Sequence, residues 1–295
     1  MGDGENRVEE GAEVSEDSGE GSPYASPAAG GSWARDAPEL CARFAAGEVT
    51  FGAWCAIPSA FSAELLAAAG FDWICVDTQH GLIGHSQMIE MLQAADAQRT
   101  PALVRVAANR PELIMAALDA GATGVVVPLV NSPEEARRAV EACRYPPLGN
   151  RSWGPARAAL RRESYTPEGA NAATICCVMI ETPHAVSQAT EILSVPGVDA
   201  VYIGPWDLSL AIHQKTPVPG GSEADREAIE AVRLAAASSG VVPGMACGGL
   251  AHVKRWVAEG FKMIAVNSDV GMLVGAASSL LEESRQAASQ AKSAR

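Results

Sequence analysis

The sequence lacks the features that mark several large protein classes. Its 295 residues hold 22 lysines and arginines against 35 aspartates and glutamates, a formal net charge of −13, whereas a nucleic-acid binder needs a basic face. No apolar run approaches the roughly 20 residues of a membrane span, and the acidic amino terminus has neither the basic flank nor the apolar core of a signal peptide. We therefore expect a cytoplasmic protein that binds neither nucleic acid nor membranes.

Disulfide frameworks and the commonest catalytic motifs are also missing. The seven cysteines are odd in number, show no C-x-x-C spacing and mostly lie inside apolar runs, which favours buried reduced thiols over disulfides or metal ligands. The chain has no G-x-G-x-x-G, P-loop, H-E-x-x-H or G-x-S-x-G motif. These absences argue against the usual nucleotide-binding, zinc-protease and serine-hydrolase assignments.

The amino-terminal segment differs in composition from the rest of the chain. Residues 1–31 contain eight acids and one base and are rich in glycine, serine, proline and glutamate, so more than half of the net charge lies there. A segment with so few apolar side chains cannot offset its own ordering entropy. We predict a disordered acidic tail over residues 1–36 and a single domain over residues 37–295.

That domain alternates short apolar runs with helix-like segments. A strand–helix–strand unit around residues 176–207 must be parallel, because a connection of that length crosses over the sheet. Eight such alternations in about 250 residues predict an α/β fold of the (β/α)8 TIM-barrel type. Strands are expected at 51–57, 73–76, 102–106, 124–127, 176–180, 200–203, 242–246 and 263–266, and helices at 37–46, 59–69, 86–98, 111–120, 133–143, 183–193, 223–238, 249–258 and 272–290. Residues 145–173 are expected to form one long connection, of the kind that serves as a lid or binding loop.

Polar residues cluster where the predicted strands end. In an α/β barrel the carboxyl ends of the strands meet at one mouth, where ligands bind. No lysine ends a predicted strand, so a Schiff-base aldolase mechanism is disfavoured and a metal-dependent route fits better. The residues predicted to converge on the mouth are His80, Arg105, Pro128, Glu181, Asp207, Cys247 and Asn267.

Two carboxylates follow neighbouring strands of this predicted barrel. Glu181 comes directly after the fifth strand and Asp207 lies four residues past the sixth. A hard divalent cation takes oxygen ligands and often only one or two carboxylates, with water and substrate completing the shell. Each residue alone is equally well read as a surface acid or a helix cap, but the pair at equivalent strand ends favours a metal site.

Three further residues at the mouth suit proton transfer and anion binding. His80 precedes Gly81 in DTQHG, and histidine is the usual proton carrier in catalysis. Asp77 either orients His80 or caps the turn. Burying Arg105 without a partner charge would be costly, so we expect it to pair with Asp77 or with a substrate oxyanion. The turn at Gly204 and Pro205 is either an anion site or a plain tight turn.

With these residues in place, the chain resembles the HpcH/HpaI aldolase family, the metal-dependent pyruvate aldolases that include 2,4-dihydroxyhept-2-ene-1,7-dioate aldolase. The resemblance covers roughly residues 47–277. It is carried by AGFDWICVDTQHG, PALVRV, LDAGATGVVVPLVNSPEEARRAVEACRYPPLGNRSWGPARA, VMIETPHAV and GVDAVYIGPWDLS. It implies a class II aldolase that cleaves a 4-hydroxy-2-oxo acid reversibly into pyruvate and an aldehyde through a metal-bound enolate.

The resemblance also implies roles for individual residues. Glu181 and Asp207 would bind the divalent cation, Mg²⁺, Mn²⁺ or Co²⁺, and His80 would act on the proton of the 4-hydroxyl group. Arg105 would hold the keto oxygen and stabilise the enolate. The family also implies an oligomer, commonly a hexamer, with the last helix packed on a neighbour. The remaining implied site residues are Asp77 and Asp119 in the proton relay, the latter reaching a neighbouring subunit's site, and Gly204, Pro205 and Trp206 as backbone N–H donors to the pyruvate carboxylate.

Three positions depart from the usual family pattern. Gln79 stands where many members have glutamate, which alters the charge near the proton relay, and Trp206 and Met179 replace smaller or polar residues beside the substrate. Two alternative functions therefore stay open. One is a condensing enzyme or CoA-ester lyase of the citrate or malyl type on the same barrel, and the other is a non-catalytic binding homologue.

Overall fold

The computed structural model describes Met1 and residues 36–161, 164–218 and 220–293. The predicted disordered tail therefore lies, apart from Met1 and residue 36, outside the described residues. The domain that follows begins with helix α1, Asp36–Ala45, close to the predicted start at residue 37.

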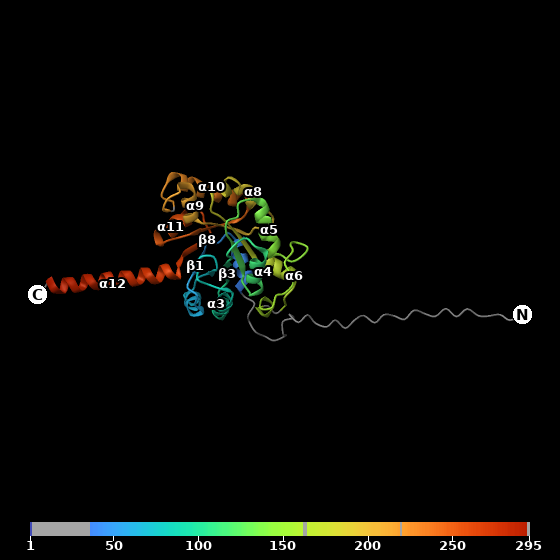
Figure 1. Ribbon diagram of the computed structural model, residues 1–295, viewed down its shortest axis with the longest axis horizontal. Helices are drawn as coiled ribbons and strands as arrows, with labels where there is room; N and C mark the ends of the chain where they lie inside the picture. The colour runs from blue at the N-terminus through green and yellow to red at the C-terminus, as the bar shows by residue number, and fades with distance from the viewer. Residues whose placement is uncertain (2–35, 162–163, 219, 294–295) are drawn as a thin grey trace.

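Eight parallel strands close into a barrel, which confirms the predicted fold (Figure 1). Each strand pairs in parallel with its two neighbours in chain order, and β1 closes the sheet against β8. The strands lie within two residues of the ranges expected from the sequence. They are β1 (Thr50–Cys55), β2 (Trp73–Asp77), β3 (Ala102–Arg105), β4 (Gly124–Val127), β5 (Ile175–Ile180), β6 (Ala200–Ile203), β7 (Val242–Ala246) and β8 (Met263–Ser268).

Helices surround the barrel, and several begin after a side-chain cap. Ser59, Ser132, Thr182 and Ser222 each accept a backbone N–H from the first turn of the helix that follows, which satisfies a donor that has no partner inside the helix. The further helices are α2 (Ala60–Ala68), α3 (His85–Ala97), α4 (Pro111–Asp119), α5 (Pro133–Cys143), α6 (Pro167–Ala173), α7 (Pro183–Ser187), α8 (Ala189–Leu193), α9 (Pro205–His213), α10 (Glu223–Ser239), α11 (Leu250–Ala258) and α12 (Asp269–Ser293).

Two of the predicted segments differ from the structure. The helix expected over 183–193 is divided into α7 and α8 at Gln188, whose ψ of 13° departs from helical geometry. The single long connection expected over 145–173 contains a 3₁₀ turn, Ala158–Arg161, and helix α6. Because this segment leads from a helix into β5, it lies at the amino ends of the strands and cannot cover the mouth.

The described arginines in and just before this segment form ion pairs with carboxylates of the same chain. Arg144 pairs with Asp199 at 2.7 Å, Arg151 pairs with Asp119 at 2.7 Å, and Arg157 pairs with Asp96. The guanidinium of Arg151 also stacks over the ring of Tyr145 at 4.5 Å. These pairs hold the connection against the barrel, so the predicted role as a lid or binding loop is wrong for the mouth of this barrel.

The core has two layers because strand side chains alternate between the barrel interior and the helices. The interior layer is built by every second residue, such as Trp73 and Cys75 on β2, or Met263 and Ala265 on β8. Gly52 leaves room for the Trp73 indole, since a Cβ there would lie 2.2 Å from the ring. Because of the same alternation, the inward-facing residue at the carboxyl end of a strand lies at the mouth of the barrel.

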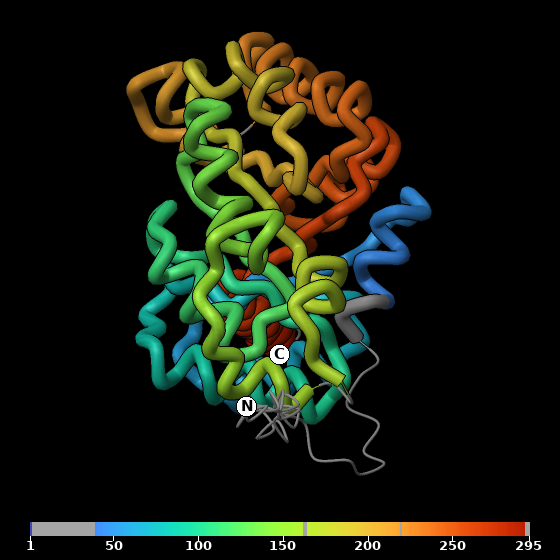
Figure 2. The backbone as a smooth tube through the Cα atoms, turned by 90° about the vertical axis from the view of Figure 1, so that its right-hand side faces the viewer, coloured from blue at the N-terminus to red at the C-terminus, as the bar shows by residue number. Residues whose placement is uncertain are grey.

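Helix α12 leaves the barrel and projects from it (Figure 1), and Figure 2 looks nearly along its axis. Residues 273–292 are all exposed, including Leu273 at 63% and Leu280 at 67%. No helix within the described part of the chain is long and apolar enough to cross a membrane. None of the seven cysteines, all of which lie in the described part of the chain, forms a disulfide; six are buried and Cys41 is half-buried, as expected for cysteines inside apolar runs.

Candidate active site

A cavity of about 380 Å³ opens at the carboxyl ends of the strands, as the sequence predicts for a ligand site. We call the end of a strand together with the loop that follows it the sector of that strand. Every sector except that of β4 contributes residues to the lining. Its lining consists of Trp54, Ala56, Asp77, His80, Arg105, Met179, Tyr202, Gly204, Pro205, Trp206, Asp207, Ala246, Cys247, Gly248, Ala265, Asn267 and Ser268.

Arg105 and Asp77, which both line this cavity, form a buried, two-pronged ion pair. The Arg105 Nε donates to Asp77 Oδ1 at 2.9 Å and Nη2 donates to Oδ2 at 2.5 Å. Such a fork fixes the plane of the guanidinium. Of the two partners expected for Arg105, the structure shows the protein carboxylate, and the remaining edge of the guanidinium borders the cavity.

Asp77 also shapes the loop that carries His80. Its Oδ1 accepts the backbone N–H groups of Gln79 and His80, each at 3.1 Å. This is the turn-capping role, and the structure contains no hydrogen bond between Asp77 and the His80 imidazole. The exposed His80 ring borders the cavity, and the buried Gln79 Oε1 has no hydrogen-bond partner within the described residues.

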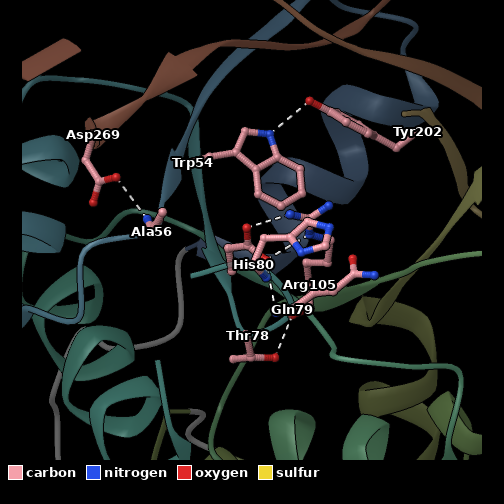
Figure 3. Close-up of polar contacts among 9 residues, drawn as sticks. Trp54, Ala56, Thr78, Gln79, His80, Arg105, Tyr202 and Asp269 are labelled. Carbon is pink, nitrogen blue, oxygen red and sulfur yellow. Dashed lines mark hydrogen bonds and ion pairs between the residues drawn. The ribbon is translucent and has the colours of Figure 1, made fainter. Parts of the chain in front are cut away.

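An aromatic pair forms the floor of the cavity next to Arg105 (Figure 3). Trp54 Nε1 donates to the hydroxyl of buried Tyr202 at 2.9 Å, and the two rings meet edge to face. The Arg105 guanidinium lies 4.5 Å from the centre of the Trp54 ring, within the range of a cation–π contact. The indole and Asp77 therefore hold the guanidinium from two directions.

The predicted carboxylate pair lies on the neighbouring strands β5 and β6. Glu181 is 2% exposed, its Oε1 accepts the Leu129 N–H at 2.8 Å, and a Cβ on Gly204 would lie 2.2 Å from Oε2. Only glycine at position 204 leaves room for this carboxylate. Burial, with a smaller contribution from the negative charge of Asp207, raises the pKa of Glu181 to about 7.

Asp207 lies in the first turn of α9, just past β6. It is half-buried and borders the cavity, and neither carboxylate forms an ion pair with a lysine or arginine among residues 36–161, 164–218 and 220–293. Thr182, not Glu181, caps the following helix, so the cap interpretation of Glu181 is wrong.

The residues present fit a divalent cation. Two carboxylates without an ion-pair partner among the described residues lie close enough for one charge to raise the pKa of the other. The more distant charge of Arg105 offsets this only in part, and a cation would relieve the rest. Within the described residues no group of three or more histidine, cysteine, aspartate or glutamate side chains could hold a metal. A cation here would therefore take its other ligands from water and substrate, as Mg²⁺ commonly does.

Helix α9 begins at the cavity, with Gly204 as its cap and Pro205 as its first residue. A helix start presents N–H groups that have no partner inside the helix, and it attracts anions. Pro205 has no N–H, so the expected donation from this residue is wrong on chemical grounds. The first-turn residues after Pro205 that border the cavity and carry an N–H are Trp206 and Asp207.

The other predicted residues fall in different places. Met179 is buried in the cavity wall, and Cys247 and Asn267 border the cavity as expected for strand-end residues. Asp119 ends α4 at the amino end of the barrel, where it pairs with Arg151, so the structure does not bring it to His80. Pro128 does not border the cavity.

Sequence reasoning missed Trp54 and Tyr202 as site residues. Both lie inside strands, whereas the sequence argument considered only residues at the strand ends. The signal was the alternation: Trp54 follows Gly52 by two residues and Tyr202 precedes Gly204 by two, so both belong to the inward-facing set of their strands.

Comparison with known proteins agrees with this geometry. Residues 50–276 match the family model for HpcH/HpaI aldolase/citrate lyase. A hydroxypyruvate/pyruvate aldolase of Rhizorhabdus wittichii is 38% identical over 81% of this chain and 95% of its own length. A 4-hydroxy-2-oxo-heptane-1,7-dioate aldolase of Klebsiella pneumoniae is 38% identical over 80% of this chain and 89% of its own.

Solved structures show the same barrel. An HpcH/HpaI aldolase/citrate lyase family protein from Burkholderia cenocepacia superposes with a TM-score of 0.78 at 31% identity, over 84% of this chain and 99% of that one. The citrate lyase beta subunit from M. tuberculosis, complexed with oxaloacetate and magnesium, shares the fold with a TM-score of 0.54 at 17% identity, over 79% and 96%. With the family model spanning most of its length, this chain belongs to the HpcH/HpaI aldolase/citrate lyase family.

Proposed function

We propose that this protein is a divalent-metal-dependent aldolase that cleaves a 4-hydroxy-2-oxo acid into pyruvate and an aldehyde, and that catalyses the reverse condensation. The observation that carries the proposal is the convergence of Asp207, Arg105 and His80 on one cavity. The buried Glu181 lies directly behind the lining residue Gly204, close enough for the charge of Asp207 to raise its pKa. The curated relatives named as aldolases support the reaction type.

The proposed chemistry follows from where charge develops. Cleavage of the C3–C4 bond leaves its electron pair on the pyruvate fragment as an enolate, while the 4-hydroxyl loses its proton and becomes the aldehyde. Mg²⁺, Mn²⁺ or Co²⁺ held by Glu181 and Asp207 would supply a Lewis acid for the 2-oxo acid. Arg105, fixed by Asp77 and Trp54, places positive charge beside the keto oxygen without needing to reorganise.

The remaining residues accept the 4-hydroxyl proton and bind the carboxylate of the substrate. His80 is exposed at the rim, where it accepts the 4-hydroxyl proton directly or through water. The N–H groups of Trp206 and Asp207 at the start of α9 bind the carboxylate of the 2-oxo acid. Asp119 stays a proposal for a neighbouring subunit's relay, since within one chain it lies at the opposite end of the barrel.

One alternative has a specific observation in its favour. The family model that matches this chain includes citrate lyases, so a carbon–carbon condensing enzyme or CoA-ester lyase would use the same carboxylates. The arrangement of His80, Arg105, Glu181 and Asp207 around one cavity argues against a non-catalytic homologue.

The test of the proposal is coupled detection of pyruvate released from a panel of 4-hydroxy-2-oxo acids, with each metal and with a chelator. We expect metal-dependent release that falls about 100-fold or more in His80→Ala, since positioned general acid–base groups contribute that much. His85→Ala is the matched control, because this exposed histidine does not border the cavity. Equal activity of the two variants would remove His80 from the mechanism, and no release from any substrate would favour the condensing enzyme.

We also propose that a second copy of this chain packs on α12, as the family's oligomers imply. The exposed Val270, Leu273, Val274 and Leu281 follow helical spacing and form one apolar stripe that the rest of the described chain leaves uncovered. Leu273→Glu with Leu281→Glu should shift sedimentation velocity from an oligomer to a monomer. Glu282→Gln with Glu283→Gln on the same helix is the control, and a monomeric wild-type protein would contradict the proposal.

A further inference from the structure

The cavity extends mainly to one side of the proposed reaction centre. No residue of β4, which lies between Arg105 on β3 and Glu181 beyond β5, borders the cavity, whereas the sectors of β7 and β8 contribute three residues each. The β7–β8 wall is built largely from small residues, among them Ala246, Gly248 and Ala265. The cavity therefore has space for the part of the substrate that becomes the aldehyde next to the ends of β7 and β8.

Asn267 lies near the end of β8, just past an irregularity in the pairing of β8 with β1, and it borders the cavity. Its Oδ1 accepts the backbone N–H of Ser268 at 2.8 Å. Because a backbone N–H can only donate, this bond identifies the oxygen and leaves the amide nitrogen as the other end. A Cβ on residue 271 would lie 2.2 Å from the same oxygen, so the glycine at this position leaves room for the Asn267 carboxamide.

The amide nitrogen of Asn267 has no hydrogen-bond partner among the described residues, and the side chain borders the cavity. The neighbouring Ser268 Oγ accepts the Gly271 N–H at 3.0 Å, and its O–H is a second neutral donor in this wall. Asn267 Nδ2 is therefore a fixed donor in this wall that stays free for a ligand.

The charges around the cavity determine what this donor suits. The charged side chains lie on the β2, β3 and β6 sectors, and Arg105 is already paired with Asp77. Within the described chain, the β7, β8 and β1 sectors of the wall carry uncharged residues only. An anionic group placed there would lose its hydration for neutral donors alone, whereas a hydroxyl group would exchange one hydrogen bond for another.

We propose that Asn267 is a specificity-determining residue, whose Nδ2 donates to a hydroxyl group on the aldehyde portion of the substrate and so favours uncharged hydroxyaldehydes over deoxy or carboxylate-bearing ones. This inference rests on the proposed aldolase function and names the substrate class of the same site. Asn267 lies on a strand two places from β6, which leads into Asp207, and two places from β2, which leads into His80. A substrate that spans these two groups would extend past Asn267.

The test compares condensation of pyruvate with glyceraldehyde, with propanal and with succinic semialdehyde. For the wild-type protein, kcat/KM should be highest for glyceraldehyde. In Asn267→Ala the ratio of kcat/KM for glyceraldehyde over propanal should fall about tenfold, the effect of one neutral hydrogen bond. Intrinsic reactivities of the two aldehydes cancel because the same ratio is compared between two proteins. An unchanged ratio would overturn the inference.

Two further measurements separate the possible failures. Exchange of the pyruvate methyl protons in deuterated water reports enolate formation without any aldehyde, so exchange with an unchanged aldehyde ratio overturns only the role of Asn267. No exchange in the wild-type protein overturns the proposed function together with this inference. Asn150→Ala, at an exposed position away from the cavity, is the matched control and should keep the wild-type ratio.

A second variant guards against misfolding of Asn267→Ala. Asn267→Asp keeps an oxygen for the Ser268 N–H and replaces the donor with negative charge. Its ratio of kcat/KM for succinic semialdehyde over propanal should fall at least about fivefold below the wild-type ratio, because like charges then face each other across the site. An unchanged ratio would show that the aldehyde does not pass Asn267, and would likewise overturn the inference.

Discussion

Glu181→Gln combined with Asp207→Asn is expected to lower metal-dependent pyruvate release by about a thousandfold or more. Both substitutions keep the side-chain volume but remove the negative charges that would hold a divalent cation. Lewis-acid stabilisation of a developing enolate contributes several kcal/mol. The measurement is kcat/KM with saturating Mn²⁺, together with titration calorimetry of Mn²⁺ binding. Both signals should disappear in the double variant.

The control for this prediction uses the same chemical change elsewhere. Glu191→Gln with Glu227→Gln removes two exposed carboxylates that do not border the cavity, and it should leave both signals unchanged. If calorimetry and activity both persisted in the Glu181 and Asp207 variant, the metal-site assignment would be wrong. If binding persisted without activity, the carboxylates would act on the substrate instead.

The pH dependence of stability gives an independent readout for Glu181 in the metal-free protein. Its pKa of about 7 lies above the 4.5 usual for glutamate, so between these values the folded state binds more protons than the unfolded state. Stability is therefore unaffected by this group below pH 4.5 and decreases as the pH rises through 7, by up to about 3 kcal/mol. In chelator, Glu181→Gln should lose less unfolding free energy than the wild-type protein between pH 5 and pH 8. An identical decrease would contradict the assigned pKa.

Arg105→Ala is expected to impair both activity and stability. Activity should fall by about 100- to 1,000-fold, the usual effect of removing a fixed donor from a developing oxyanion. Stability should fall by about 3–5 kcal/mol, since Asp77, 4% exposed, would remain buried without its counter-charge. The measurements are kcat/KM and chemical denaturation of the metal-free protein.

A second change separates the two effects. Arg105→Gln with Asp77→Asn removes both charges, so it should recover much of the stability while activity stays low. Arg144→Lys is the control for a buried ion pair away from the cavity, because Arg144 pairs with Asp199 at the amino end of the barrel. It should reduce stability and leave kcat/KM unchanged. Full activity of the Arg105 double variant would show that the guanidinium has only a structural role.

Much of the fold could be predicted from the sequence because the patterns that indicate strands and helices are local. The alternation of apolar runs with helical segments is set by the periodicities of strands and helices, and it predicted all eight strands within two residues. Parallel strands of one barrel share a mouth, so positions at or just past the strand ends were enough to bring His80, Arg105, Asp207 and Asn267 to one cavity. The same reasoning placed Glu181 next to them, behind Gly204.

The tertiary structure decided what these residues contact. Only the closed barrel shows that Arg105 forms a fork with Asp77 beneath the Trp54 ring, and that Gly204 leaves room for the Glu181 carboxylate. Those contacts join side chains on different strands, and their distances depend on register and barrel closure, which local periodicity does not encode. For the same reason, the sequence placed Asp119 in the proton relay while the fold places it at the opposite end of the barrel, where only a second chain could bring it to a site.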